Sequence, residues 1–163
     1  MNMRKDHPPA KGKAPSQEKV IATNRKAWHD FAIEETFETG VALAGSEVKA
    51  IRAGRADLKE AYAEMHQGEL WLCSLSIQPL ATSTFAPPPA RRRKLLVHRN
   101  QLDRLVGKTA HKGMALIPLK LYFNARGWAK VELGLGKRRP KGDKREVLKK
   151  KVADREMRQA RER

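Results

Sequence analysis

The stretch MALIPLKLYFNARGWAKVELGLGK, residues 114–137, points most directly to the architecture of this chain. Apolar and polar residues alternate on both sides of the polar segment Asn124–Gly127, which is typical of two strands joined by a turn. Pro118 has no backbone N–H to donate to a neighbouring strand, so its strand is expected to run along an edge or to contain a bulge there. The stretch therefore predicts a long β-hairpin.

Two further hairpins are predicted upstream. In residues 58–79, LKEAYAEMHQGELWLCSLSIQP, the pair Gln67-Gly68 predicts the turn between two alternating segments. In residues 28–44, the segments WHDFAIEE and FETGVALAG alternate in the same way, and Gly40 is expected to form the turn.

Two short helices are predicted between the hairpins. GSEVKAIRAG, residues 45–54, has Ser46 as the expected N-cap and Gly54 as its stop. VHRNQLDRLVGK, residues 97–108, places Leu102, Leu105 and Val106 on one face. The order β-β-α-β-β-α-β-β predicts a mainly β fold: a small closed antiparallel OB-like barrel of about six strands with two or three short helices.

The barrel is expected to lie between two basic termini. Residues 1–19 are polar and rich in Pro and Gly, and are predicted to be a disordered arm; residues 20–137 form the expected barrel. Residues 138–163 form a basic tail, predicted to be disordered in the free protein. From Lys137 onward there are 13 basic and five acidic residues, a net charge of +8.

The charge of the whole chain predicts a polyanionic partner. Lys and Arg number 35 against 18 Asp and Glu, which gives a net charge of +17 over 163 residues. No apolar run approaches the ~20 residues of a membrane span, so nucleic acid is favoured over a membrane. Cys73 is the one cysteine and is expected to be a small buried side chain. No segment resembles a signal peptide, and a cytoplasmic location is expected.

The titratable residues do not form a pattern typical of an enzyme. Glu34 and Glu35 are neighbours on an expected strand, so alternation would send them to opposite faces, away from a shared metal ion. The five histidines lack ligand spacing, and no phosphate-binding loop or nucleophile motif occurs. We therefore expect no catalytic residue, metal, cofactor or small-molecule substrate; a metal-dependent nuclease ranks last among the functions considered.

Basic and aromatic residues together suggest contact with RNA. Trp71 is expected in the core, whereas Trp128, at a hairpin turn, is the more open stacking candidate. Lys120 and Lys130 alternate outward on their strands, and for each alone a simple solvated face is an equal alternative. The candidate phosphate contacts are Asn24, Arg25, Lys26, the run Arg91–Lys94, Lys120 and Lys130.

Four separated segments carry a resemblance to a known family. They are IATNRKAWHDFAIEETFETGVALAGSEVKAIRAGRADLKEAYAE (21–64), RRRKLLVHRNQLDRL (91–105), IPLKLYFNARGWAKVELGLGK (117–137) and DKRE (143–146). In this order they closely resemble the SsrA-binding protein (small protein B, SmpB) family of bacterial trans-translation, over about residues 20–150.

The resemblance implies a non-catalytic adaptor that binds the tRNA-like domain of transfer-messenger RNA (tmRNA) and delivers it to stalled ribosomes. It marks Asn24, Arg25, Glu38, Leu96 and Lys130 as positions associated with tmRNA binding. Glu38 cannot attract phosphate, so it is expected to accept a hydrogen bond from a base or to brace a turn. The full set expected to bind RNA is Asn24, Arg25, Lys26, Glu38, Arg93, Lys94, Leu96, Lys120 and Lys130.

The resemblance also implies a tail that orders inside the mRNA channel of the small ribosomal subunit. Val147, Leu148, Val152 and Met157 form too thin an apolar stripe to pack on a core, and an isolated helix of this length is marginal in water. The tail residues expected to contact the ribosome are Lys137, Asp143, Lys144, Arg145, Lys149, Lys150, Lys151 and Arg155.

The sequence departs from the family pattern in two places after the last expected strand, and the loop FAPPPARRRKLL (85–96) departs from the polar Asn/Asp-Pro stretch usual there. Arg138-Arg139 replaces its usual Gly-Lys pair, and Gly142 stands where the family has an aromatic residue or His before Asp143. A stacking contact from a ring at that place is therefore not expected. The alternative to a tmRNA adaptor is a general OB-type single-strand RNA-binding or ribosomal protein.

Overall fold

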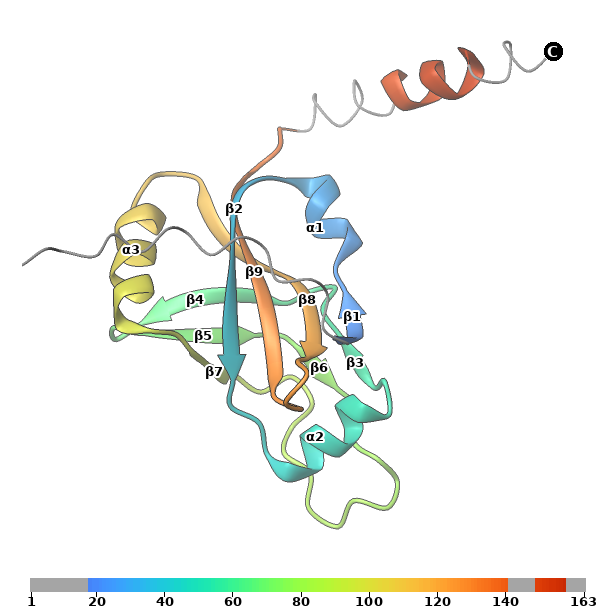
Figure 1. Ribbon diagram of the computed structural model, residues 1–163, viewed down its shortest axis with the longest axis vertical. Helices are drawn as coiled ribbons and strands as arrows, with labels where there is room; N and C mark the ends of the chain where they lie inside the picture. The colour runs from blue at the N-terminus through green and yellow to red at the C-terminus, as the bar shows by residue number, and fades with distance from the viewer. Residues whose placement is uncertain (1–17, 141–148, 158–163) are drawn as a thin grey trace, which may run out of the picture.

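The computed structural model describes residues 18–140 and 149–157. Most of the predicted N-terminal arm (1–17) and Asp143, Lys144 and Arg145 of the tail lie outside the described residues. The described chain runs in the order β1-α1-β2-α2-β3-β4-β5-β6-β7-α3-β8-β9 (Figure 1).

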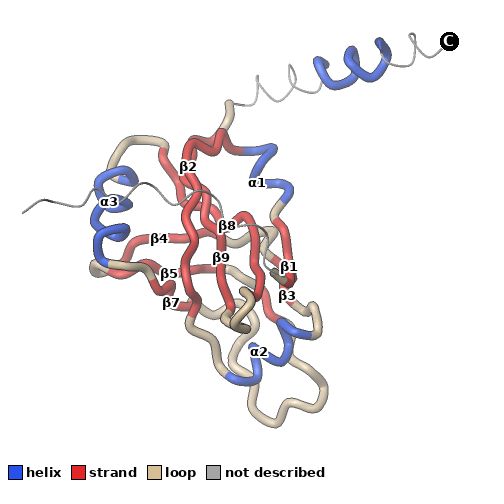
Figure 2. The backbone as a smooth tube through the Cα atoms, viewed as in Figure 1, coloured by secondary structure: helices blue, strands red, loops and turns tan. Residues whose placement is uncertain are grey.

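Six antiparallel strands form a closed ring, in the order β8-β4-β5-β7-β2-β9, and the pairing of β8 with β9 closes it. This confirms the predicted OB-like barrel. The tube view in Figure 2 shows these strands curving around one another. The ring strands are β2 (Phe31–Val41), β4 (Tyr62–His66), β5 (Glu69–Cys73), β7 (Arg93–Leu96), β8 (Met114–Phe123) and β9 (Ala129–Arg138).

The remaining elements lie around the ring. Strand β1 (Lys19–Thr23) pairs with the second half of β8, from Lys120 to Phe123, whereas β4 pairs with β8 at Leu116. Strand β3 (Ala56–Asp57) pairs with β6 (Ser76–Ile77) as a separate two-stranded sheet. The helices are α1 (Arg25–Asp30), α2 (Gly45–Arg52) and α3 (Arg99–Thr109). A further helix spans residues 149–157 in the tail, and every side chain on it is exposed.

The β8–β9 hairpin forms as the sequence predicted. The Asn124 side chain accepts hydrogen bonds from the N–H groups of Arg126 (3.1 Å) and Trp128 (2.9 Å), and Gly127 has a φ of 79°. These contacts shape the turn. The register shifts between Pro118 and Lys120, which is the bulge expected at a proline.

The β4–β5 hairpin is also confirmed. Gln67 and Gly68 both have positive φ, 50° and 75°. Two positive φ angles in a two-residue loop match the right-handed twist of the flanking strands. The five residues of β4 then pair in register with the five of β5.

The predicted hairpin over residues 28–44 is wrong. Its first part is helix α1, and its second part is one continuous strand, β2. The Asn24 side chain accepts a hydrogen bond from the Ala27 N–H at 3.1 Å and so caps α1, a helix signal that alternation concealed. Gly40 lies within β2, where it pairs with both Lys130 of β9 and Leu96 of β7. A Cβ at Gly40 would lie 3.2 Å from the Leu96 Cβ, so glycine here permits a close crossing rather than a turn.

The two other helices form where the sequence predicted them, apart from one cap and the exposed position of Val106. Helix α2 ends before Gly54, which has a φ of 77°, as expected of a glycine stop. Its N-cap is Ala44, not Ser46, and the Glu47 carboxylate supplies the capping contact by accepting a hydrogen bond from the Ala44 N–H at 2.9 Å. Helix α3 covers the ring with Leu105 fully buried, but Val106 is exposed.

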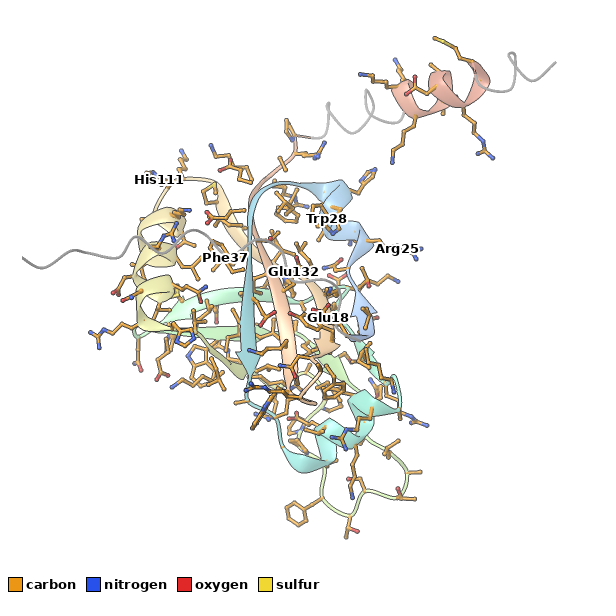
Figure 3. All side chains as sticks on the ribbon, in the orientation of Figure 1. Glu18, Arg25, Trp28, Phe37, His111 and Glu132 are labelled. Carbon is orange, nitrogen blue, oxygen red and sulfur yellow. The ribbon has the colours of Figure 1, made fainter. Side chains whose placement is uncertain are left out.

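The core fills the interior of the ring with leucine and valine, joined by Phe37 of β2 (labelled in Figure 3). A second, smaller cluster of Ala27, Ile117 and Leu119 lies under α1. Cys73 is buried, as expected. The prediction that Trp71 lies in the core is wrong. Trp71 is partly exposed and belongs to neither cluster, whereas its neighbours Leu70 and Leu72 point inward.

One buried ion-pair cluster joins α2 to β7. The Glu47 carboxylate accepts hydrogen bonds from the Arg93 guanidinium at 2.8 and 3.0 Å and from Arg91 at 2.6 and 2.9 Å. The Arg93 side chain is fully buried and also donates to the carbonyl oxygens of Leu75 (2.6 Å) and Pro89 (2.9 Å). Burial raises the pKa of Glu47, but the hydrogen bonds from Arg91, the Ala44 N–H and Arg93 outweigh it and leave the pKa below its ordinary value.

Glu47→Gln is expected to lower the free energy of unfolding by about 3–5 kcal/mol, because it leaves the buried Arg93 charge without its counter-ion. Urea denaturation at pH 7 measures this. The matched control is Glu69→Gln, which breaks the surface pair with Lys94 and should cost less than about 1 kcal/mol. A loss for Glu47→Gln as small as that of the control would contradict the role assigned to the cluster.

The difference in free energy of unfolding between the wild type and Glu47→Gln should depend on pH. Because the folded-state pKa of Glu47 is lowered, its stabilising contribution is complete above the unfolded-state pKa, near 4.5, and is lost as the pH falls through the lower folded value. The stability difference between wild type and Glu47→Gln should therefore shrink in that acidic range.

Candidate nucleic-acid interface

Three residues that are distant in the sequence, Glu38, Leu96 and Lys130, line a single groove of about 940 Å³. Glu38 is near the end of β2, Leu96 ends β7, and Lys130 is the second residue of β9. They meet because Gly40 pairs with both Lys130 and Leu96. Strand pairing thus joins three of the predicted binding residues into one surface.

The groove also presents apolar surface. Trp128, after the β8–β9 turn, is 66% exposed, and Leu96 is 55% exposed; both belong to the groove lining. Exposed indole rings offer flat faces on which nucleic-acid bases stack. The more open position predicted for Trp128 is confirmed. Phe123 lies deeper in the lining and is buried.

A charged network runs across the outer face of β2, β9 and β8. The Lys130 Nζ is 3.3 Å from Glu38 Oε1, and the Tyr122 hydroxyl donates a hydrogen bond to Glu38 Oε2. This tyrosine contact, the stronger influence, and Lys130 hold the pKa of the Glu38 carboxyl below its ordinary value, against the opposing effect of burial. Glu38 is therefore an ionised acceptor between two donors.

Lys120 lies beside this network. Its Nζ is 4.5 Å from the centre of the Tyr122 ring and 3.2 Å from a carboxylate oxygen of Glu18. Lys120 and Lys130 both point outward, as alternation predicted, and their side chains are 28% and 27% exposed. Each cation has a carboxylate partner on the protein that a phosphate would have to displace.

Asn24, Arg25 and Lys26, which were predicted to bind RNA, lie on or next to α1, at the end of β2 opposite the groove. The Asn24 side chain is buried: besides capping α1, it donates to the carbonyl oxygens of Leu58 and Pro118, each at 3.2 Å. Asn24 is thus held inside the fold, where it caps α1 and joins it to Leu58 and Pro118. Arg25 is exposed and projects away from the barrel (Figure 3), and Lys26 pairs with Glu60 at 3.6 Å.

The two basic residues that begin β7, Arg93 and Lys94, point to opposite faces of the sheet. Arg93 is buried against Glu47, so the expectation that it contacts phosphate is corrected: alternation turns its side chain into the barrel. Lys94, the next residue, points outward and pairs with Glu69 at 2.5 Å. Lys94 therefore lies on the outer face of β5 and β7 and does not line the groove.

Within the described residues, no group of three His, Cys, Asp or Glu side chains could hold a metal ion. Glu34 and Glu35 do lie close together, because a bulge between Ile33 and Glu35 interrupts the alternation expected there. Glu35 is paired with Lys108 and lies 3.9 Å from Arg104. No helix among the described residues is long and apolar enough to cross a membrane.

Sequence reasoning missed the link from Tyr122 to Glu38. Tyr122 is 4% exposed and was not among the residues expected to bind RNA. The available signal was its spacing: Tyr122 is two residues from Lys120 and so shares its face, and across the hairpin it pairs with Lys130. The position of β2 beside β9, which brings in Glu38, had no local signal.

A closed antiparallel ring with an aromatic, cation-lined groove is typical of OB-type nucleic-acid-binding barrels. The family model described as "SmpB protein" matches residues 21–163. The chain therefore belongs to the SmpB family.

Individual relatives at about 50% identity are SsrA-binding proteins. The chain is 52% identical over 144 residues to the SsrA-binding protein of a Nitratiruptor species, covering 87% of this chain and 96% of that one. It is 48% identical over 143 residues to the SsrA-binding protein of Bacillus subtilis, covering 87% and 91%. A solved structure described as "tmRNA-SmpB: a journey to the center of the bacterial ribosome" matches with a TM-score of 0.64 and 46% identity, over 79% of this chain and 94% of that chain.

Proposed function

We propose that this chain is a tmRNA-binding adaptor of trans-translation: it binds the tRNA-like domain of tmRNA with its barrel and brings it to stalled ribosomes. The observation that carries the proposal is the meeting of Glu38, Leu96 and Lys130 in one groove. Family membership and the similarity to a tmRNA-bound relative support it. Ribosomes would then be the second partner, and the cytoplasm the place of action.

The groove supplies three kinds of contact to RNA. Lys130 can exchange Glu38 for a phosphate, Trp128 and Leu96 offer apolar surface to an unstacked base, and Glu38 accepts a hydrogen bond from a base edge. Arg25, Lys26 and Lys120 add positive charge outside the groove, and Lys94 adds it on another face of the barrel. A folded RNA that touches several sides of the barrel would engage these together.

The tail is proposed to act on the ribosome rather than on tmRNA. Residues 149–157 form a helix whose side chains, including Val152 and Met157, are all exposed, so the described helix has no core-facing side. Lys149, Lys150, Lys151 and Arg155 give it a basic surface suited to a channel lined with RNA. Lys137, at the end of β9, and Asp143, Lys144 and Arg145 complete the proposed ribosome-binding set.

Lys130→Ala and Arg25→Ala should each weaken binding to a tRNA-like RNA and flatten its salt dependence. Each lost phosphate contact removes about 0.7–0.9 from the slope of log affinity against log salt. Titrations of tmRNA's tRNA-like domain at several salt concentrations measure both quantities. Lys112→Ala, an exposed lysine between α3 and β8, is the matched control. Slopes equal to that of the wild type for both variants would show that the contact surface is misplaced.

Glu38→Ala is expected to reduce RNA affinity about tenfold or more while the barrel stays folded, because a base loses its acceptor. Glu38→Gln keeps one acceptor oxygen and should retain much more binding than Glu38→Ala. Affinity and melting temperature are measured for both. Equal losses would mean that the charge of Glu38 matters rather than its hydrogen bond, and a strongly lowered melting temperature would make Glu38 a structural residue.

Ending the chain after Lys141 removes no barrel strand, so binding to tmRNA should survive with a modest loss from weaker charge steering. Tagging of peptides on stalled ribosomes should nevertheless collapse, because the tail acts where the message is missing. Alanine at Asp143, Lys144 and Arg145 together should reproduce much of this defect. Full tagging by the shortened chain would refute the division of labour between barrel and tail.

Competition between folded and unstructured RNA tests the specific partner. An adaptor for tmRNA should prefer a tRNA-like fold over single-stranded RNA of equal length. Equal affinity for both would favour a general OB-type RNA-binding protein instead.

A further inference from the structure

Tyr122 combines burial with a position on the outer face of the barrel. It lies opposite Lys130 of β9 and opposite Val20 of β1, and its neighbours Leu121 and Phe123 belong to the core. Tyr122 belongs to neither apolar cluster, yet only 4% of it is exposed. The Lys120 Nζ stands 4.5 Å from its ring centre. Its ring is therefore fixed among polar and charged side chains at the surface of the sheet.

Among the described residues, the hydroxyl of this tyrosine donates its hydrogen bond to Glu38. The two carboxylate oxygens of Glu38 have different donors: Oε2 accepts from Tyr122, and Oε1 lies 3.3 Å from Lys130. The donors also differ in mobility. Lys130 has a flexible four-carbon stem and a cation that phosphate attracts, whereas Tyr122 has a rigid, packed ring.

We infer that Tyr122 is a positioning residue for RNA binding: it holds the Glu38 carboxylate toward the groove after Lys130 turns away to an RNA phosphate. This inference rests on the proposed function of the groove. Without the tyrosine hydroxyl, release of Lys130 would leave Glu38 free to rotate into solvent, and a base would have to order it at an entropic cost.

The charged surroundings agree with this role. Six side chains face Glu38 or its immediate neighbours: Lys120 and Tyr122 of β8, Lys130 and Glu132 of β9, Glu18 before β1, and His98 across the groove. The hydrogen bond from Tyr122 is the strongest influence lowering the pKa of Glu38, ahead of Lys130. Burial and the contact with Glu38 raise the pKa of Tyr122, so its hydroxyl keeps the proton that it donates throughout the neutral range.

Tyr122→Phe removes the hydroxyl and keeps the ring, and it tests the inference directly. Binding to tmRNA's tRNA-like domain should weaken about tenfold, the usual size of one lost hydrogen bond to a charged group. In a Glu38→Ala background the same change should have little further effect, because the two residues act as a unit. The matched control is Tyr62→Phe, an exposed tyrosine on β4, which should bind like the wild type.

The carboxyl titration of Glu38, followed by NMR in the free protein, separates positioning from a general structural role. Tyr122→Phe should raise the pKa of Glu38 toward its ordinary value, and Lys130→Met should raise it less. Since binding needs the ionised carboxylate, the RNA affinity of Tyr122→Phe should fall more steeply than that of the wild type as the pH is lowered toward 4.5, the ordinary pKa of Glu.

Three outcomes are distinguishable. If wild type binds the tRNA-like RNA selectively and Tyr122→Phe binds equally well, the positioning role is wrong and the proposed function stands. If wild type shows no such selectivity, the proposed function fails first. If Tyr122→Phe folds poorly, Lys130→Met remains decisive: a rise in the Glu38 pKa as large as the whole depression would make Lys130 the holding residue and overturn the inference.

Discussion

The barrel depends on a buried carboxylate, Glu47, that holds two arginines. Strand β7 joins β5 to β2 in the ring, yet each of its two sides has only two residue pairs in register. Arg93 opens this short strand and is fixed to Glu47, to the Leu75 carbonyl and to the Pro89 carbonyl. The ion pair therefore secures a strand that is only briefly paired on both sides, and its hydrogen bonds satisfy charges that would otherwise be costly to bury.

This ion pair also affects the groove, because Arg93 and Leu96 are the two ends of strand β7. Arg93 begins β7 and Leu96 ends it, so anchoring the arginine also places the exposed leucine beside Gly40 and Lys130. Glu47 at the same time caps α2, whose Val48 lines the groove. The Glu47–Arg93 ion pair, whose residues do not line the groove, thus positions two residues that do, Leu96 and Val48.

The groove and the start of the basic tail lie at opposite ends of strands β2 and β9. The groove lies where β2 ends and β9 begins, whereas α1 precedes β2, and the tail follows β9 at the other end of these strands (Figure 1). The Arg139 N–H donates to the Asp30 carbonyl at 2.9 Å, which fixes the start of the tail to the end of α1. Arg138, Arg139 and Pro140 therefore leave the barrel at the end opposite the groove.

Local patterns were sufficient for the class of fold and for two of the three hairpins. Turn residues at Gln67-Gly68 and Asn124–Gly127, the proline bulge and the glycine stop of α2 all act through backbone conformation within a few residues, so the sequence reveals them. Overall charge indicated a polyanion, and separated motifs indicated the family. The sequence could also name Glu38, Leu96 and Lys130, but only through resemblance.

What those residues do was decided by contacts between distant segments. Alternation alone could not show that Arg93 faces a buried carboxylate while Lys94 faces solvent, because the inward side is defined only once the ring closes. Alternation also predicted a turn at Gly40, whereas the glycine fits there because the Leu96 side chain of another strand leaves little room for a Cβ. Residues 38, 122 and 130 meet on one face because β2, β9 and β8 are neighbours in register, a long-range pairing that leaves no trace in the local sequence.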